Sequence, residues 1–569
     1  MKKLLFMLLL AAVAAVNTNA QDVKEPTSPD YTKAKEALDE GDFFTADSLL
    51  SEEVRKHPKN GYAWMYRGAL YSNLEADTAI TFLDKAVRLL PKKDKENLAM
   101  AYLWRASSKW RIREDFDGLV ADVRASQRTN PSIAAPSMLL AQVLTSRGDY
   151  EGAERELRQA LTKNDVKKAD AYQFMGRNKM SQDDYAAAIK YYDQAMEFDR
   201  NDETIYIDRS QAYMAQHNDD KGIDDAVKAF GMEFSRNSFA YLCSLGDSTE
   251  LREKVVSRIE AETHRVSDPT LYYFTISYIF GNADNEAESL RYLLRASKTS
   301  DEPLYEHIGE KLAGCALYEQ AADYYRRAVE AMPDSVDNSE RENLMDKYIG
   351  YLFEGGKTKE AIQLKANMPI PDKDNDTEAF NHQIAELSWY KYYAGDYAGA
   401  LADMELLPEE VKNDPDNALF RGKIYRENGM TDKAQECFAL CATEEMAEEN
   451  PTTAEIAYAL VGNTAKAREI FEARQAEDPD NVSDFGAACL MALIGDKPMA
   501  VNYLRQSFEN GLRNFFKVER DEDLQSLKGY NDYEALLTEY KAKFEVEKKA
   551  LLDVLKEETQ EAPIQLVGE

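Results

Sequence analysis

Histidine and cysteine are scarce in this chain of 569 residues, which contains five of each. No two histidines stand at the spacing of a metal-binding pair, so the sequence offers no ligand set for a zinc hydrolase. Five cysteines are an odd number and predict no disulfide framework. Cys437 and Cys441 stand four residues apart on an expected helix. We interpret them as two small buried side chains, with zinc as the less favoured alternative, and we expect no metal and no cofactor.

Catalytic motifs are missing as well. The sequence has no Gly-rich phosphate loop and no nucleophile elbow, and it contains neither Asp-Thr-Gly nor Asp-Ser-Gly, which an aspartic protease requires. Asp484, Phe485 and Gly486 spell the magnesium-binding triplet of kinases, but the other kinase motifs are absent, so we attribute the triplet to chance. The sequence therefore predicts no catalytic residues and a protein that is not an enzyme.

Basic residues are outnumbered. The chain has 103 Asp and Glu residues against 70 Lys and Arg residues, which gives a net charge of −33. Such a surface repels nucleic acid backbones and anionic lipids, and it favours basic or neutral partners. Aspartates alternate in residues 372–376 as they do at the start of a calcium loop, but Thr377 and Gln383 stand where that loop needs Gly and Glu. A solvated acidic linker is the interpretation of this stretch.

Long apolar runs are limited to the start of the chain. Lys2 and Lys3 precede an apolar run at residues 4–16, which is followed by small residues up to Ala20. This layout predicts a secretory signal peptide cleaved between Ala20 and Gln21. No cysteine lies nearby to carry a lipid anchor, and no second stretch of ~20 apolar residues follows. We therefore expect a periplasmic or secreted protein that does not insert into the membrane once the signal peptide is removed.

A repeat of about 34 residues is abundant along the chain. Residues 146–164, 181–199 and 317–334 each show an aromatic near the start, an Ala, a bulky residue four positions later and a second Ala three beyond that. The pattern resembles the tetratricopeptide repeat (TPR), a helix–turn–helix unit. One well-matched unit carries Tyr305, Gly309, Ala321, Tyr325, Ala328 and Pro333. The resemblance implies an all-α fold, a right-handed superhelical solenoid of such units.

The repeat and its interruptions predict the organisation of the chain. The expected parts are a signal peptide at 1–20, a disordered lead at 21–30, the first part of the array at 31–370, an acidic linker at 371–377, the second part of the array at 378–510, a capping segment at 511–540, and a charged C-terminal helix with a frayed tail at 541–569.

In the TPR family, first helices line a concave groove that binds a protein or peptide. The resemblance implies a groove-lining role for Met138, Gln142, Thr145, Gln173, Arg177, Met180, Gln211, Met214, Glu306, Glu310, Lys423 and Arg426. Polar side chains with some Met suit an extended peptide or a helix. We thus expect an exported, non-catalytic scaffold for protein or peptide binding. The alternatives are a carbohydrate-handling or accessory helical protein of the cell envelope, or the partner of a separately encoded protease or transporter. The sequence leaves the partner and the oligomeric state open.

Overall fold

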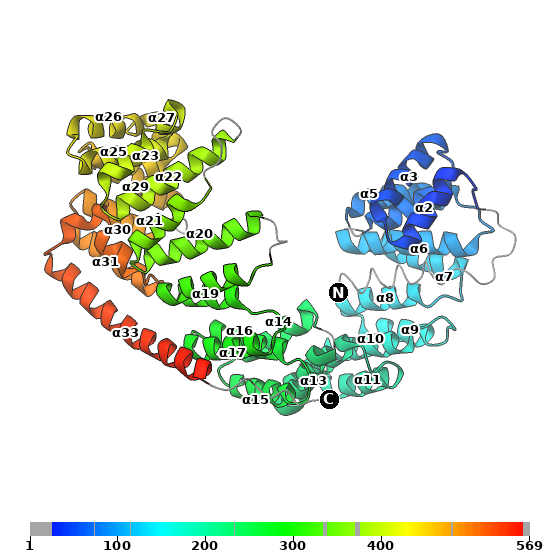
Figure 1. The fold of residues 1–569 in the computed structure, drawn as a ribbon. Helices are drawn as coiled ribbons and strands as arrows, with labels where there is room; N and C mark the ends of the chain where they lie inside the picture. The colour runs from blue at the N-terminus through cyan, green and yellow to red at the C-terminus, as the bar shows by residue number, and fades with distance from the viewer. Residues whose placement is uncertain are drawn as a thin grey trace. The chain divides into compact units, whose positions relative to one another are not determined.

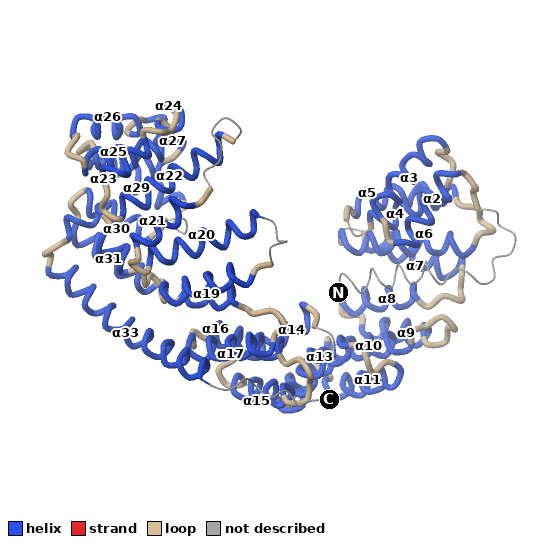
Figure 2. Tube along the Cα trace, in the orientation of Figure 1, coloured by secondary structure: helices blue, strands red, loops and turns tan. Residues whose placement is uncertain are grey.

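The computed structural model describes residues 25–72, 74–113, 115–232, 234–333, 338–369, 376–478 and 482–560. Within these ranges the chain consists of helices and the turns between them, without strands (Figures 1 and 2). The prediction of an all-α fold made of helix–turn–helix units is confirmed. None of the described helices combines the length and the apolar character needed to cross a membrane. The predicted signal peptide and most of the predicted acidic linker lie outside the described residues.

The chain forms two compact units, of which the first ends at Arg258. Its helices pack in consecutive pairs, and each pair packs on the next. The pairs are α2 (Pro29–Glu40) with α3 (Phe43–Lys56), α4 (Gly61–Tyr71) with α5 (Ala76–Leu89), α6 (Lys95–Ile112) with α7 (Phe116–Thr129), α8 (Ala135–Ser146) with α9 (Tyr150–Ala160), α10 (Lys168–Met180) with α11 (Tyr185–Phe198), and α12 (Glu203–Ala215) with α13 (Asp219–Met232). Next, α14 (Arg236–Asp247) packs on α13, and α15 (Arg252–Thr263) runs across the unit boundary.

The second unit continues the same construction. Its pairs are α16 (Thr270–Asn282) with α17 (Glu286–Thr299), α18 (Tyr305–Gly314) with α19 (Tyr318–Ala331), α20 (Asn338–Glu354) with α21 (Thr358–Asn367), α22 (Thr377–Tyr393) with α23 (Tyr397–Met404), α25 (Pro415–Glu427) with α26 (Thr431–Cys441), α28 (Pro451–Leu460) with α29 (Thr464–Glu477), and α30 (Asp484–Leu493) with α31 (Lys497–Glu509). The short helices α24 (Glu409–Lys412) and α27 (Glu444–Glu449) lie between pairs. The chain ends with α32 (Phe515–Arg520), the 3₁₀ helix η2 (Glu522–Leu527) and the long α33 (Asn531–Gln560).

Two consecutive residues form the turn between the two helices of a pair: one ends the first helix and the other caps the second. A residue in the left-handed region ends the first helix, as Gly148 does with φ = 81° and Gly395 with φ = 84°. The next residue, Asp149 or Asp396, accepts a hydrogen bond from the backbone N–H three positions later and so caps the second helix. Glycine tolerates the left-handed conformation, and Asp is a preferred N-cap, so the local sequence fixes where each hairpin turns.

Glycines also allow the two helices of a pair to cross closely. A Cβ added at Gly309 of α18 would lie 2.7 Å from the Tyr325 ring on α19, and one added at Gly422 of α25 would meet the Phe438 ring on α26. Both rings are buried, and in both pairs the ring follows the glycine by 16 residues. A small residue opposite a large one fills the crossing at the density of a protein interior. This spacing is the structural cause of the Gly–aromatic part of the repeat.

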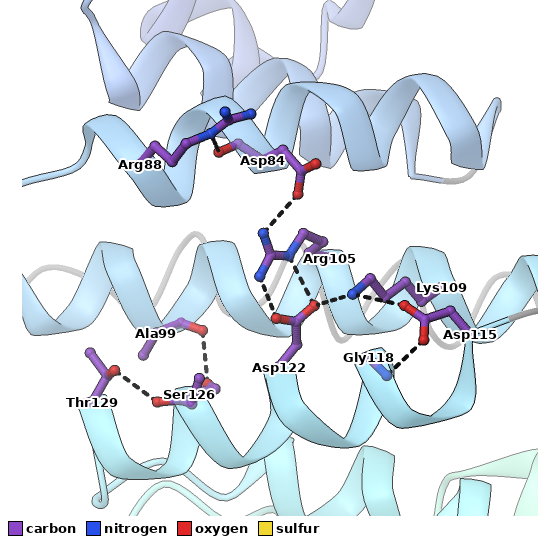
Figure 3. Close-up of polar contacts among 11 residues, drawn as sticks. Asp84, Arg88, Ala99, Arg105, Lys109, Asp115, Gly118, Asp122, Ser126 and Thr129 are labelled. Atoms are coloured by element: carbon purple, nitrogen blue, oxygen red, sulfur yellow. Dashed lines mark hydrogen bonds and ion pairs between the residues drawn. The ribbon is translucent and has the colours of Figure 1, made fainter.

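Arginines on first helices tie neighbouring pairs together. Arg105 of α6 lies between α5 and α7, with Nη1 2.7 Å from Asp84 and Nε 2.9 Å from Asp122 (Figure 3). Asp122 is 4% exposed and also pairs with Lys109 Nζ at 3.1 Å. Arg209 of α12 makes the same two-sided contact with α11 and α13. Because a buried carboxylate requires a paired cation, these contacts hold successive hairpins in register.

The second unit is closed by its last helix. From its start beside α31, α33 runs back to α17, the second helix of the first pair in this unit (Figure 1). There Leu551 and Val554 are buried in a cluster with side chains of α17, α18 and α19. Glu558, 2% exposed, pairs with Arg295 at 3.2 Å and Lys298 at 2.9 Å. The stretch predicted as a separate helix after residue 540 is therefore continuous with the helix that begins at Asn531.

Candidate peptide-binding faces

Eight of the predicted groove residues lie on α8, α10 and α12 in the first unit. We call the surface that these three first helices present the first-helix face. The structure buries Met138 and Gln173 and leaves Gln211 exposed. The other five are half-buried, namely Gln142, Thr145, Arg177, Met180 and Met214. The face thus combines accessible polar and methionine side chains with buried ones that are held in place.

Hydrogen bonds join successive first helices across this face. Gln173 Nε2 on α10 donates to Thr204 Oγ1 at 2.9 Å and to Asp208 Oδ2 at 2.8 Å, both on α12. Arg177 Nε donates to the same Asp208 oxygen at 2.6 Å. One repeat earlier, Thr145 Oγ1 on α8 donates to Asn178 on α10 at 2.9 Å. Three predicted residues, Gln173, Arg177 and Thr145, therefore support the face and are not free to bind a ligand unless these bonds break.

Sequence reasoning missed Asp208, the carboxylate on which this network depends. It stands 31 residues after Arg177, one repeat further along, so an opposite charge at the repeat spacing was the available signal. Burial raises the pKa of Asp208, although Arg177 acts in the opposite direction. Burial also raises the pKa of Asp170 at the start of α10. Carboxylates in such surroundings are more stable in the charged form when a further cation approaches.

In the second unit, the predicted residues of α18 remain accessible. Glu306 and Glu310 are exposed, and Glu310 pairs with Lys347 of α20 at 3.1 Å. The median exposed pair of this kind contributes about 0–1 kcal/mol, so it does not fix the face.

The predicted residues of α25 are already occupied by the chain itself. Residues 511–530, which contain α32 and η2 and which we call the α32–η2 segment, place Glu522 and Asp523 against α25. Lys423 Nζ lies 2.7 Å from Asp523 and 3.1 Å from Glu522. Arg426 Nη2 lies 3.4 Å from Glu522. The carboxylates that pair with Lys423 and Arg426 lie in a segment that departs from the repeat, so the repeat pattern did not predict these ion pairs.

The α32–η2 segment is a fixed part of the second unit. Val518, Leu524 and Leu527 are at most 1% exposed. Full burial of each such side chain contributes about 1.5–3 kcal/mol, so displacing the three would cost about 5–9 kcal/mol. A partner peptide would have to replace that burial before it reached Lys423. The face of α25 is therefore covered.

Metal chemistry finds no support in the described part of the chain, where no group of three or more His, Cys, Asp or Glu side chains could hold a metal ion. Cys437 and Cys441 are both buried, as interpreted from the sequence.

Comparison with known proteins assigns the repeat. Residues 169–202, which include α10 and α11, match the family model described as tetratricopeptide repeat. The chain therefore contains a tetratricopeptide repeat at these residues. The matched repeat supplies Gln173, Arg177 and Met180 of the first-helix face.

Several solved structures are similar to parts of the chain. One is a tetratricopeptide repeat protein from Parabacteroides merdae, 13% identical, with a TM-score of 0.33 over 56% of this chain and 97% of that one. Another is the C-terminal part of a TPR repeat-containing protein from Cytophaga hutchinsonii, 12% identical, with a TM-score of 0.31 over 48% and 96%. A third is pilF of Pseudomonas aeruginosa, 15% identical, with a TM-score of 0.29 over 36% and 90%. No protein in the curated collection matches the sequence.

Proposed function

We propose that this protein is an exported scaffold that binds a segment of a partner protein on the first-helix face of α8, α10 and α12, without catalysing a reaction. The observation that carries the proposal is the hydrogen-bonded support from Gln173 and Arg177 to Asp208, which fixes this face before a ligand arrives. Preorganisation lowers the entropy that binding must overcome. Gln211 is exposed and Gln142 is half-buried, so both remain accessible to a ligand.

The charge of the protein narrows the chemistry of the partner. A net charge of −33 favours a basic or neutral segment and disfavours nucleic acid. Asp170 and Asp208, whose pKa values are raised by burial, point in the same direction, because a cationic side chain would stabilise their charged forms. Methionines and amides adapt to different ligand surfaces and suit a peptide.

Site-specific photocrosslinking of the full chain tests the proposed face. A photoreactive residue placed at Gln142 or at Gln211 should crosslink the same partner protein from cell-envelope extract. Arg155 of α9 and Lys190 of α11, the control positions on second helices, are exposed and should not crosslink it. Equal crosslinking from all four positions would contradict the proposal. A product containing only glycan would favour the carbohydrate-handling alternative instead.

Export is tested separately by N-terminal sequencing of the protein made in a bacterial host with a periplasm. Cleavage by signal peptidase should leave Gln21 as the first residue and place the protein outside the cytoplasm. Retention of residues 1–20 on cytoplasmic protein would contradict export and would leave the binding proposal intact.

A further inference from the structure

The last helix of the chain contacts both ends of the second unit. α33 extends over 30 residues, or about 45 Å at 1.5 Å per residue. Its first turns pack on the last pair of helices, where Tyr533, Leu536 and Leu537 are buried in a cluster with side chains of α30 and α31. Its last turns pack on α17, α18 and α19 of the first two pairs through Leu551 and Val554 (Figure 1). One helix therefore joins parts of the unit that lie on either side of the pairs from α20 to α29.

The contact at the far end of α33 is held by charge as well as by apolar burial. Glu558 is 2% exposed, and its oxygens lie 3.2 Å from Arg295 Nε and 2.9 Å from Lys298 Nζ of α17. The neighbouring Glu557 pairs with Arg291 Nη2 at 3.1 Å. A buried carboxylate requires its cations close by, so these pairs fix both the position and the rotation of the helix end on α17.

Between these two contacts α33 is largely exposed. Residues 545–547, 549 and 550, which we call the exposed middle of α33, are accessible, and Val546 is 72% exposed. Phe544 and Lys548 line a cavity of about 250 Å³ whose wall also includes residues of α19, α20 and α32. The exposed middle thus rests beside a cavity and is not packed into a core. Its partly accessible ion pair, Glu547 with Arg513 at 3.1 Å, is of the weak surface kind.

The sequence of α33 favours an unbroken helix across this exposed middle. It contains no Gly and no Pro, the residues at which helices kink most often. Ion pairs within the helix support its conformation on either side, with Lys543 and Glu539 at 2.7 Å and Lys556 and Asp553 at 3.6 Å. A continuous helix that is fixed at both ends holds the groups at its ends at a constant distance.

A stack of helix pairs is the kind of structure in which such a constraint matters. Its curvature is the sum of small rotations between neighbouring pairs, so small changes at successive junctions accumulate along the stack. The α32–η2 segment ties the last pair to α20, through Asn514 Nδ2 and Glu354 Oε2 at 3.1 Å. It ties the last pair to α25 through Asp523 and Lys423. The pairs that come before α20 are joined to the last pair by α33.

We propose that α33 is a strut: by holding the first two pairs at one end and the last pair at the other, it fixes the curvature of the second unit. This role differs from covering an apolar surface. A cap acts through its contact alone, whereas a strut also needs an unbroken length between its two contacts. The exposed middle, which buries little, is the part of α33 in which the two roles can be separated.

Distances between two spin labels on the full chain test the strut. Glu306 of α18 and Asn502 of α31 are both exposed, and nitroxides attached there through ketone-bearing residues avoid the native cysteines. Double electron–electron resonance should give a narrow distance distribution in the otherwise unchanged chain. Val546→Pro, which breaks the helix in its exposed middle, should widen this distribution, and the matched control Val546→Ala should not.

A second variant removes the contact at the far end. Leu551→Ser combined with Val554→Ser weakens docking on α17–α19 and should also widen the distribution. Amide hydrogen exchange in α17 reports whether the end of α33 stays docked. The fluorescence of Trp389, the one tryptophan after residue 110, reports whether the unit is folded.

Three results would overturn the proposal. A broad distribution in the otherwise unchanged chain would show that α33 does not fix the curvature. A narrow distribution in Val546→Pro would show that α33 acts as a cap alone. A narrow distribution in the folded double-serine variant would show that the helix pairs set the curvature by themselves.

Discussion

Single glycines decide how closely two helices of a pair approach, and α18 contains both a critical and a neutral example. A methyl group at Gly309 would press on the buried Tyr325 ring, whereas one at Gly314 would meet nothing within 4 Å. Ala gains up to ~1 kcal/mol over Gly in a helix, and overpacking costs about 1–3 kcal/mol. In urea unfolding, Gly309→Ala should therefore destabilise the protein by about 1–2 kcal/mol, and Gly314→Ala should be neutral or stabilising. Equal effects would contradict the register of α18 on α19.

Glu522 makes stability depend on pH. Burial and the neighbouring Asp523 raise the pKa of Glu522 to about 8, although Lys423 and Arg426 lie within ion-pair distance of its carboxylate. The pKa of Glu522 is higher in the folded than in the unfolded protein. Glu522 therefore contributes stability when the pH is below the ordinary pKa of Glu, and this contribution is lost as the pH rises toward the folded-state pKa. Glu522→Gln removes this loss.

The gain in unfolding free energy of Glu522→Gln over the wild type should thus grow between about pH 5 and pH 8, to the order of 2 kcal/mol. Asp521 and Cys489 also have raised pKa values nearby, so the difference between variant and wild type is the informative quantity. Chemical unfolding across this pH range measures it. A gain that shrinks as pH rises would show that the ion pairs with Lys423 and Arg426 dominate.

At the scale of elements, the helical hairpins could be predicted from the sequence because the residues that define each hairpin lie within one repeat. In α10 and α11, the spacing from Gly176 to Tyr192, the Asp184 cap and the helical periodicity all lie within one unit and together predict the hairpin. The partners of Lys423 and Arg426 are about 100 residues away in the α32–η2 segment, where no repeat fixes the register. Long-range pairing of this kind leaves no periodic trace in one sequence, so these two side chains were predicted as ligand-binding although they are paired.

The buried arginine ion pairs between neighbouring helix pairs should contribute far more to the free energy of unfolding than exposed ion pairs do. Arg105→Met leaves Asp122, 4% exposed, with Lys109 as its remaining cation, and breaking such a buried pair costs about 3–5 kcal/mol. The double variant Arg105→Met with Asp122→Leu removes the stranded carboxylate and should recover most of the loss. Arg158→Met, in a pair whose arginine is 64% exposed, should change stability by less than ~0.5 kcal/mol. Thermal and urea unfolding compare the three, and a double variant no more stable than Arg105→Met would contradict the coupling.

At the scale of the whole chain, closure of the second unit depends on the end of α33. An open stack of hairpins leaves the apolar side of its terminal pairs exposed, and repeat proteins cover it with a polar-faced cap. Here Leu551 and Val554 cover α17–α19, and Glu558 neutralises Arg295 and Lys298.

Deleting residues 541–569 removes this cover, and loss of the two apolar side chains alone should cost about 3–6 kcal/mol. Deleting only residues 561–569 spares α33 and serves as the control. The long deletion should lower the urea midpoint reported by Trp389 and speed amide hydrogen exchange in α17, while the short one should change neither. Unchanged exchange in α17 after the long deletion would show that the stack is stable without closure, and that the returning helix has some other role.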